Sequence, residues 1–271
     1  MHFTTDSEKE NQKQMKISII TITYNSAATV EDTIKSVVMQ DYPNVEYLII
    51  DGKSKDSTLQ IAEKYKDKIS KIVSEKDKGL YDALNKGIKH ASGEIIGMLH
   101  SDDLYAHPQV LKHVVETFQK NPDAEGVYAD LVFVNRNDTN KVMRTWESGE
   151  YQEGDFLKGW MPPHPTFFVR KEVYEKFGGF NTELKLSADY ELMLRLIHKN
   201  NIKLAYLNET IVKMRMGGVS NVSFFVKLKA NLEDKMAWKL NGIKPNMMTM
   251  LMKPLRKIGQ YFKRAYNMFF Y

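Results

Sequence analysis

Apolar runs and amphipathic segments alternate along the first 120 residues of the chain. Residues 16–25, KISIITITYN, are a nearly continuous β-rich run, as is typical of a strand buried on both faces of a parallel sheet. Residues 29–40 follow with apolar positions at helical spacing. Three further strands, each followed by a helix, are indicated in the same way. The strand at 45–58 runs into a polar turn, and a helix begins at about residue 56. A strand at 71–75 precedes a helix at 79–92 that is broken near Gly87, and a strand at 94–103 precedes a helix at 108–119. This alternation predicts a doubly wound, mostly parallel α/β sheet.

From residue 126 onward the alternation weakens. The pattern indicates an antiparallel pair of strands, a short strand after a proline-rich loop, and a strong amphipathic helix with Ser187 as its N-cap. One or two strands and a final helix follow. The ranges of these elements are 126–136 with 141–147, 162–171, 187–200, 202–220 and 221–240. We therefore expect a smaller antiparallel part beside the parallel sheet.

Polar and acidic residues stand at the ends of the predicted strands. They are Asn25, Asp51, Glu75 with Asp77, and Asp102 with Asp103. Ligands of doubly wound sheets bind outside the carboxyl ends of the strands, so this row indicates a binding site. The adjacent Asp102 and Asp103 repel each other unless something positive lies nearby. A metal ion, a basic side chain and plain solvent are the explanations that the residues leave open.

The composition is that of an ordinary globular protein, with 42% hydrophobic and 27% charged residues. The sequence has no cysteine, which excludes disulfides, thiolate metal sites and a cysteine nucleophile. The net charge of +5 comes from the C-terminal part, because eight of the 39 basic residues and no acidic residue follow Asp234. The other 31 basic residues face 34 acidic ones. This distribution indicates a tail with an anionic partner, not a nucleic-acid-binding domain.

The C-terminal segment 248–271 has the pattern of a basic amphipathic helix. Apolar residues recur at spacings of three and four from Met248 to Phe269, and lysines and arginines occupy the other faces. Such a helix suits an anionic membrane surface. Packing on the domain or on another subunit is the alternative. The sequence has no apolar run of about 18 residues, so no transmembrane helix is predicted. Segment 1–14 lacks the apolar centre of a signal peptide, and because it is polar we expect it to be disordered.

Several motifs occur in a fixed order along residues 16–220: TITYNS, IIDGKSKDST, SEKDKGLYDALNKG, LHSDD, PHPTFF, SADYELMLRL and GGVS. In this joint order they resemble glycosyltransferase family 2, whose members have the GT-A fold and use nucleotide-sugar donors. The resemblance implies a GT-A domain at 15–220. Its nucleotide-sugar-binding half would be 15–120 and its acceptor-binding half 121–220, with 221–271 as a basic helical appendage.

The acidic motif at the strand end holds, in this family, a divalent cation that binds the diphosphate of the donor. The resemblance therefore implies Asp102 as a metal ligand, with Asp103 in support and Ser101 on the donor side. The cation would be Mn²⁺ or Mg²⁺, since both accept carboxylate oxygen and leave positions for phosphate oxygens. Many relatives have Asn or Asp at the position of His100, and this departure leaves the role of His100 open.

The resemblance also implies a nucleoside pocket. Its residues would be Thr23, Tyr24, Asn25, Asp51, Asp77 and Lys86. Asp51 matches the family's aspartate that recognises the nucleoside, whereas Asp77 and Lys86 would contact the uridine and the phosphate side. An Asx turn is the alternative role of Asp51, and Lys86 could equally be a solvated helix residue.

Asp189, in the first turn of the 187–200 helix, matches the family's general base. Such a base removes the proton of the acceptor hydroxyl as the new bond forms, and a single displacement inverts the anomeric configuration. His164 and Trp160 would lie on the acceptor side. The structural alternatives are a helix acid favoured by the macrodipole for Asp189, a surface-loop histidine for His164 and a core aromatic for Trp160.

Motifs and strand ends together predict an inverting hexosyltransferase that moves one sugar, from a donor expected to be UDP-linked, to a glycan or lipid-linked acceptor in surface polysaccharide synthesis. We expect it in the cytoplasm, peripheral on the inner face of the membrane. Two alternatives belong to other classes. A phosphohydrolase would need a second acid in an Asp-x-Asp pair, which IIDGKS lacks. A non-catalytic nucleotide or nucleic-acid-binding protein would use the basic tail, but the acidic strand ends argue against a nucleic acid partner.

Overall fold

The computed structural model describes residues 14–217, 224–244 and 249. Two sequence expectations lie outside the described residues: the disordered segment 1–14, apart from Gln14, and the amphipathic helix 248–271, apart from Thr249. Within the described ranges, no helix is both long enough and apolar enough to cross a membrane.

The first half of the sheet is parallel, because its strands are apolar enough to be buried on both faces. β1 (Ile17–Thr23) lies between β2 (Val45–Asp51) and β4 (Ile95–Met98), and β3 (Lys71–Ser74) flanks β2. The last residue of β2 lies opposite the last residues of β1 and of β3. These three strands therefore end together at one edge.

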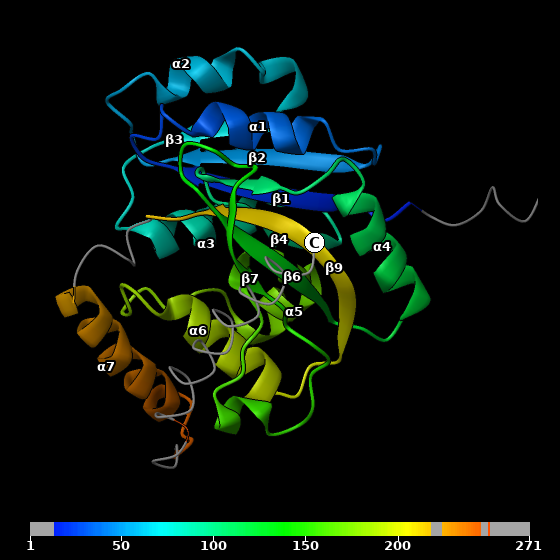
Figure 1. Ribbon diagram of the computed structural model, residues 1–271, viewed down its shortest axis with the longest axis vertical. Coiled ribbons are helices and arrows are strands. Elements are labelled where there is room, and N and C mark those ends of the chain that lie inside the picture. The colour runs from blue at the N-terminus through cyan, green and yellow to red at the C-terminus, as the bar shows by residue number, and fades with distance from the viewer. Residues whose placement is uncertain (1–13, 218–223, 245–248, 250–271) are drawn as a thin grey trace, which may run out of the picture.

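Helices cover both faces of the parallel half (Figure 1). α1, α2 and α4 pack on one face with Ile17 and Ile19, whereas α3 packs on the other face with Ile20 and Ile22. The bounds are α1 (Val30–Val38), α2 (Thr58–Glu63), η2 (Lys66–Lys68), α3 (Leu80–His90) and α4 (Val110–Lys120). The sheet thus separates two hydrophobic cores, as expected for a doubly wound fold.

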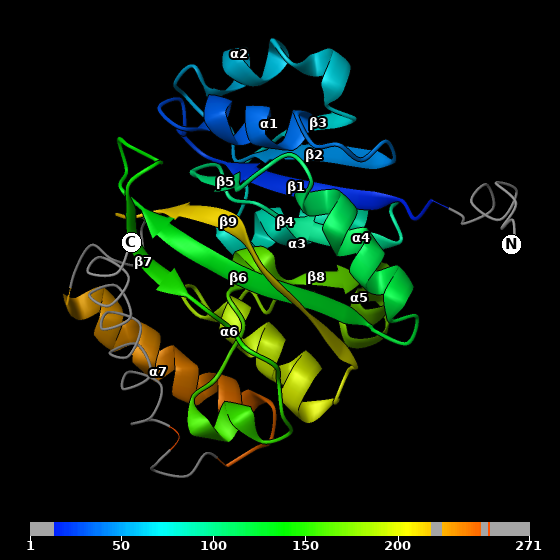
Figure 2. The same ribbon diagram turned by 45° about the vertical axis from the view of Figure 1, so that its right-hand side comes forward.

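The second half of the sheet is mixed. β8 (Phe168–Arg170) joins β4 to β6 (Gly126–Val134) by antiparallel pairings, and β9 (Leu204–Arg215) runs parallel to β6. β7 (Val142–Trp146) forms the expected antiparallel pair with β6, and β5 (Asp103–Tyr105) pairs antiparallel with β9. Figure 2 shows β6 and β9 as long neighbouring strands. The predicted α/β architecture with a smaller antiparallel part is confirmed.

The strand expected at 94–103 was predicted too long. It ends at Met98, Asp102 lies in a turn, and Asp103 opens the separate strand β5. The physical reason is strand pairing: β4 pairs with β1, whereas β5 pairs with β9. The two aspartates therefore lie at a junction between strands.

Three other elements also differ from expectation. α3 continues through Gly87 without a break, because Gly87 lets the helix approach β1: a Cβ there would lie 2.4 Å from Ile20 Cγ2. The 187–200 helix consists of α6 (Ala188–Met193) and the π-helical η5 (Leu194–Lys199). α5 (Lys171–Phe177) was not anticipated. The short 3₁₀ turns η3 (Asp155–Lys158) and η4 (His164–Thr166) precede it.

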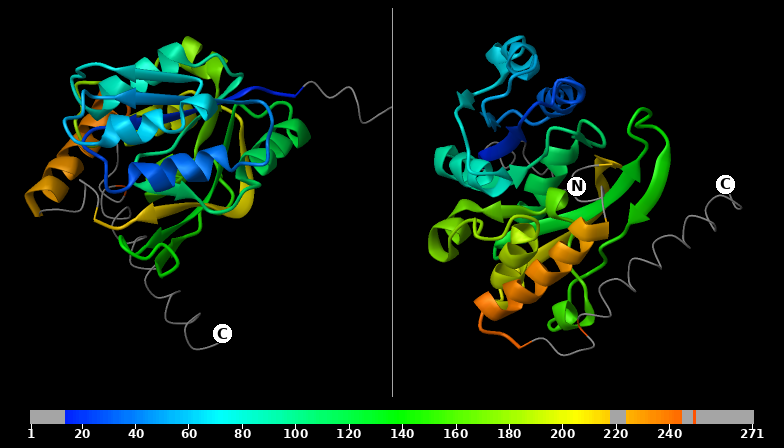
Figure 3. Two further views of the ribbon diagram at one scale, coloured as in Figure 1. Left: turned by 90° about the horizontal axis from the view of Figure 1, so that it is seen from above. Right: turned by 90° about the vertical axis from the view of Figure 1, so that its left-hand side faces the viewer.

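α7 (Phe224–Leu240) packs against α6, at the end of the molecule opposite α1 and α2 (Figure 3). The Glu233 carboxylate accepts hydrogen bonds of 2.7–3.1 Å from the backbone N–H groups of residues 185–187. Ser187 precedes α6 as expected, but its hydroxyl donates to the carbonyl of Ala230 at 3.2 Å and does not cap the helix. The described part of the predicted appendage is therefore attached to the body of the domain.

Candidate active site

Asp51 ends β2 and is 0% exposed. Its carboxylate accepts hydrogen bonds from the hydroxyls of Thr23 at 3.0 Å and Ser74 at 2.7 Å, and from both the backbone N–H and the hydroxyl of Ser54. Burial alone would raise the pKa of Asp51, but these hydrogen bonds outweigh it and lower the pKa. Four donors fill the acceptor positions of a carboxylate. The hydrogen bonds from Ser54 fit the alternative role of Asp51 in a turn, and contact with a nucleoside stays a prediction.

The loops after β1, β2 and β3 meet around Gly52. A Cβ on Gly52 would lie 2.4 Å from Asp77 Oδ2 and 3.3 Å from Tyr24 Cδ2, so these two side chains flank the glycine. Tyr24 is 60% exposed, which leaves its ring available to stack on a planar base. Asn25 adopts a left-handed φ of 50°, and its Oδ1 accepts a hydrogen bond of 2.8 Å from the backbone N–H of Lys55. The structure thus brings together the residues expected to line the nucleoside pocket.

Lys86 lies on α3 beside the same loops. Its Nζ is 2.9 Å from Glu75 Oε1 and 3.5 Å from Asp82 Oδ2, and it donates to the carbonyl of Lys76 at 3.0 Å. Partial burial would lower the pKa of Lys86, but the two carboxylates outweigh it and raise the pKa. Lys86 is therefore a cation, and a phosphate group would have to compete with two carboxylates for it.

Asp102 and Asp103 lie in contrasting surroundings. The Asp102 side chain is half-buried, and its carboxylate has no hydrogen bond or ion pair with another described residue. Asp103 is 1% exposed, and its Oδ1 accepts a 3.3 Å hydrogen bond from the backbone N–H of Arg215. Its buried Oδ2 has no hydrogen-bond partner in the described part of the chain. Burial and repulsion by Asp102 raise the pKa of Asp103 well above its usual value, against the opposing effect of Arg215.

Arg215, at the end of β9, holds this turn in place. Its side chain is 4% exposed, and its guanidinium contacts the Asp32 carboxylate at 2.5 Å. It also donates to the carbonyl of Asp102 at 3.0 Å and to the carbonyl of Arg136 at 3.2 Å. The Ser101 hydroxyl joins the turn to the loop after β1 through a 2.8 Å hydrogen bond to the Ser26 hydroxyl. Asp102 is therefore fixed at the same edge as the ends of β1 and β2.

The carboxylate oxygens at this turn are suitable ligands for a hard divalent cation. Half-buried Asp102 offers an unpartnered carboxylate, and the buried Oδ2 of Asp103 has no donor facing it among the described residues. Oxygen ligands of this kind suit Mg²⁺ and Mn²⁺.

Asp189 lies in the first turn of α6 with a side chain that is 24% exposed. Its Oδ1 accepts a hydrogen bond of 3.1 Å from the Tyr81 hydroxyl on α3. Its Oδ2 lies 3.3 Å from Nδ1 of His164, which begins η4. Burial and the neighbouring Asp189 raise the pKa of Tyr81, so the hydroxyl keeps its proton and acts as a donor. Side chains from α3 and η4 therefore flank the Asp189 carboxylate of α6.

His164 is within electrostatic reach of Asp189, the predicted base, and of Asp102, the predicted metal ligand. Burial lowers the pKa of His164, and both Asp189 and Asp102 are close enough to oppose that shift. The ring of His100 meets the ring of His164 edge-on, with 5.3 Å between the centroids. Burial, with a contribution from His164, lowers the pKa of His100 to about 3, so His100 is neutral at physiological pH. The imidazole pair thus lies against Asp189 and within electrostatic reach of Asp102.

Trp160, expected on the acceptor side, is buried in the core. It is 6% exposed, and its indole N–H donates to the carbonyl of Ser148 at 2.8 Å. Its ring packs against Tyr128, Tyr151 and Phe156. Large aromatic rings gain most from such burial. The position supports the core alternative and gives no support to an acceptor contact.

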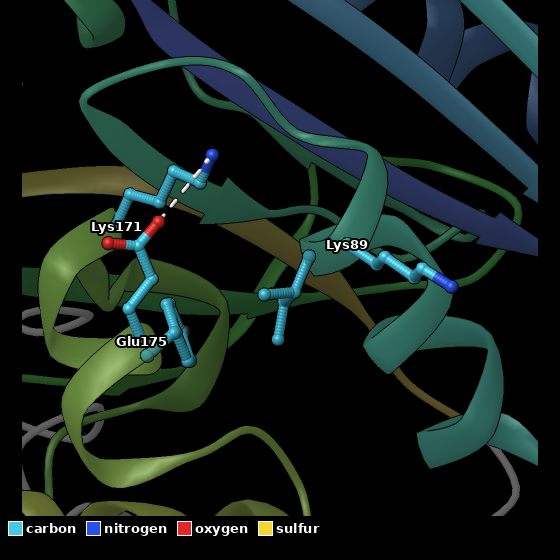
Figure 4. A pocket seen from close by; sticks show the side chains of 5 residues that line it. Lys89, Lys171 and Glu175 are labelled. Carbon is cyan, nitrogen blue, oxygen red and sulfur yellow. Dashed lines mark ion pairs between the residues drawn. The ribbon is translucent and has the colours of Figure 1, made fainter.

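A surface hollow lies apart from the strand ends, between α3 and α5 (Figure 4). Ile88, Lys89, Lys171, Tyr174 and Glu175 line it, and Lys171 pairs with Glu175 at 3.7 Å. None of the predicted site residues is among them. The strand-end edge is therefore the candidate active site on the strength of its chemistry, not of a deep cavity.

Comparison with known proteins decides the family. The sequence profile of the family described as glycosyl transferase family 2 matches residues 18–178, which is more than half of the 271-residue chain. The chain belongs to glycosyl transferase family 2. This family 2 chain is 31% identical to an uncharacterized glycosyltransferase of Mycobacterium tuberculosis, over 66% of the chain and 68% of the relative. It is 26% identical to a PGL/p-HBAD biosynthesis glycosyltransferase of Mycobacterium bovis, over 75% and 78% of the two chains.

Solved structures agree with the family 2 fold. TarS of S. aureus in complex with UDP-GlcNAc superposes with a TM-score of 0.65 at 19% identity, over 84% of this chain and 65% of TarS. A mannosyltransferase of Pyrobaculum calidifontis in complex with GDP-Man and Mn²⁺ gives a TM-score of 0.65 at 18% identity, over 89% and 69%. The chain thus spans slightly less than two thirds of the TarS chain. The predicted family, GT-A fold and transferase class are confirmed.

Two residues of this family 2 site were not foreseen from the sequence. Tyr81 reaches Asp189 across 108 residues of chain, and Arg215 reaches Asp102 across 113. Arg215 did carry a signal, since a cation near the end of an otherwise half-buried strand needs an anionic or carbonyl partner. Tyr81 lies in a helix whose face is otherwise apolar, and nothing in LYDALN singles it out.

Proposed function

We propose that this chain is an inverting glycosyltransferase that moves one sugar from a UDP-linked donor to a hydroxyl of a glycan or lipid-linked acceptor in surface polysaccharide synthesis. The observation that carries the proposal is the Asp189 carboxylate 3.3 Å from His164 Nδ1, with Asp102 in electrostatic reach of the same imidazole and its turn joined to the loop after β1 by Ser101. Membership of family 2 supports the transferase class and favours neither the phosphohydrolase nor the non-catalytic binding protein.

Tyr24, Asn25 and Asp77 would line the nucleoside end of the donor site, and Ser101 and Asp103 would lie on the diphosphate side. Thr23 and Asp51 would hold the loop that carries Gly52. The TarS structures with UDP-GlcNAc and with UDP support a UDP-linked donor on this fold. The mannosyltransferase with GDP-Man supports a GDP-linked donor as the competing choice.

Asp102, with Asp103 behind it, would hold Mn²⁺ or Mg²⁺. When bound, the cation would stabilise the charge that develops on the leaving diphosphate. The mannosyltransferase structure, which contains Mn²⁺, supports this assignment.

Asp189 would take the proton of the acceptor hydroxyl. The acceptor oxygen forms a bond to the anomeric carbon from the face opposite the nucleotide, the bond from that carbon to the diphosphate oxygen breaks, and the configuration inverts. The Tyr81 hydroxyl donates to Asp189 Oδ1, and His164 Nδ1 lies 3.3 Å from Asp189 Oδ2, so neighbours on both sides restrict the direction of the carboxylate. Each oxygen keeps a second lone pair, which can receive the proton.

A donor panel tests the proposal. UDP- and GDP-sugars are supplied with lipid-linked acceptors and Mn²⁺, and nucleotide release is measured with product analysis. We expect one donor to be preferred, EDTA to abolish transfer, and Asp102→Asn to weaken donor binding in the presence of Mn²⁺. Asp67→Asn is the matched control, because Asp67 is an exposed acid away from the strand ends. A fully active Asp102→Asn enzyme would contradict the proposed role.

We also propose a cytoplasmic location at the inner face of the membrane, through residues 248–271. The support is the basic amphipathic pattern in the sequence. The chain ending at residue 247 should lose sedimentation with anionic vesicles, whereas the full chain should bind them and ignore neutral ones. Equal binding of both chains would refute the role of the tail.

A further inference from the structure

Two histidines and a glutamate from separate elements converge beside the β5–β9 pair. His107 follows β5, His113 lies in α4, and Glu209 lies in β9. His107 Nε2 is 2.6 Å from Glu209 Oε1, and His113 Nδ1 is 2.8 Å from Glu209 Oε2. The three ligand atoms lie within 4.8 Å of one another, and all three residues are half-buried.

An irregular stretch of β9 carries Glu209 out of the ladder. Ala129 of β6 pairs with Leu207, but the next residue, Asp130, pairs with Thr210. Two residues of β9, Asn208 and Glu209, therefore have no counterpart in β6. Such bulges redirect side chains. Here the result is a carboxylate placed against two imidazoles.

The contact between His107 and Glu209 is not an ordinary hydrogen bond. The two atoms are 2.6 Å apart, yet the buried Nε2 has no hydrogen-bond partner among the described residues. A buried ring nitrogen this close to a carboxylate oxygen without a hydrogen bond is a position that a bound cation can satisfy. The other nitrogen of His107, Nδ1, lies 3.3 Å from the backbone N–H of Gln109. That contact is at the long limit for a hydrogen bond, so its loss when Nδ1 becomes protonated costs little.

We propose that His107, His113 and Glu209 bind a divalent transition metal of the Zn²⁺ class. Imidazole and carboxylate are zinc ligands, and three protein ligands leave a fourth position for water. Zinc-to-ligand distances of about 2.0–2.1 Å correspond to about 3.3 Å between ligand atoms in a tetrahedron. The distances from the two histidine nitrogens to the Glu209 oxygens are 2.6, 2.8 and 3.2 Å, so accepting the ion requires them to widen by up to about 0.7 Å.

The metal would have a structural role. The loop that contains His107 leads from β5, which begins with Asp103, into α4, and β9 ends with Arg215, which donates to the carbonyl of Asp102. A metal here would link the loop after β5 to β9, the two segments that flank the Asp102 turn. The three side chains share no hydrogen bond or ion pair with Asp102 or Asp189 within the described ranges. The inference therefore stands apart from the proposed transfer activity.

Metal binding is tested on the full chain, freed of any affinity tag and treated with EDTA. With free Zn²⁺ at about 100 times its Kd, the unfolding temperature should rise by about 5–10 °C. Co²⁺ should give the visible absorption bands of a four-coordinate site with nitrogen ligands. His113→Gln and Glu209→Gln should lose both signals, whereas His90→Gln, a matched change on α3, should keep them. Each variant is first shown by circular dichroism to be folded without metal.

Asp102→Asn separates this site from the one proposed for the donor cation, because it should retain the Zn²⁺ shift and the Co²⁺ bands. No shift in the wild-type chain, a shift that persists in Glu209→Gln, or a shift lost in Asp102→Asn would each overturn the proposal. In the first case the three residues are a hydrogen-bonded cluster only. None of these results changes UDP binding or the Mn²⁺ dependence of transfer, so the two proposals fail separately.

Discussion

Asp189→Asn is the most direct perturbation of the proposed chemistry. Asparagine keeps the shape and one acceptor oxygen, so the hydrogen bond from the Tyr81 hydroxyl can persist. Its amide group cannot take a proton at physiological pH, and the NH₂ would face His164 Nδ1, which lies 3.3 Å from Asp189 Oδ2. The site loses its base while the helix that carries it keeps its packing, since the side chain is not part of the core.

The expected effect on kcat follows from this geometry. General base catalysis contributes about 10²–10⁴-fold, so kcat should fall by that factor, or about 3–5 kcal/mol in activation free energy. Donor affinity should change by less than about twofold, because Asp189 contacts Tyr81 and His164 but none of the residues around Gly52. The free energy of unfolding should change by about 1 kcal/mol or less, as expected for one half-exposed hydrogen bond.

The assay is nucleotide release at saturating donor, with donor affinity measured separately by calorimetry. Glu183→Gln is the matched control: it removes the same charge from an exposed residue shortly before α6 and should leave kcat unchanged. A fall in kcat of less than about fivefold in a folded Asp189→Asn protein would refute the role of Asp189 as general base. A loss confined to donor affinity would refute it as well, and would place Asp189 in the donor pocket.

Three further predictions concern the support of the site and of the fold. Arg215→Met should lower the free energy of unfolding by about 2–4 kcal/mol in urea titrations, because it strips a donor from the Asp32 carboxylate and from buried carbonyl groups. Gly52→Ala should leave stability within about 1 kcal/mol but weaken UDP binding about tenfold in calorimetry, since its Cβ must push the flexible end of Asp77 aside. Burial would raise the pKa of Glu46, but hydrogen bonds from two serines and a lysine outweigh it and lower the pKa from 4.5 to about 2. The stabilisation from Glu46 is therefore present above pH 4.5 and lost toward pH 2, so Glu46→Gln should cost about 2–3 kcal/mol at pH 7 and almost nothing near pH 2 in thermal denaturation.

Local pattern was enough to predict the parallel half of the fold. The run ISIITIT is buried along its whole length, as a central strand between two layers of helices must be. The failures share a cause. β5 has only three residues, too few to show a period, and it exists because β9, about a hundred residues later, offers it a partner. α3 looked broken at Gly87, whereas that glycine is needed for close packing on Ile20.

The same division applies to the site. The acidic row could be predicted because strands of a parallel sheet end at one edge, and the sequence places Asp51 and Asp102 where strands stop. Most of what surrounds each carboxylate could not be predicted, because all partners except Ser54, which lies three residues after Asp51, come from distant segments. Four donors saturate Asp51, Tyr81 and His164 flank Asp189, and Trp160 is buried in the core.

The paired aspartates lie at the junction between β4 and β5. The residues alone allowed solvent, a basic side chain or a metal ion to relieve their repulsion. Solvent does not serve Asp103, which is 1% exposed. A basic side chain is present, but the guanidinium of Arg215 is engaged by Asp32 and by main-chain carbonyls, and only its backbone N–H reaches the Asp103 carboxylate. Its charge therefore opposes the rise in the pKa of Asp103 without cancelling it. The Asp102 carboxylate and one buried oxygen of Asp103 are left facing no donor in the described part of the chain. A site built this way is costly unless a cation occupies it during the working cycle, which is why we place the donor's metal at Asp102.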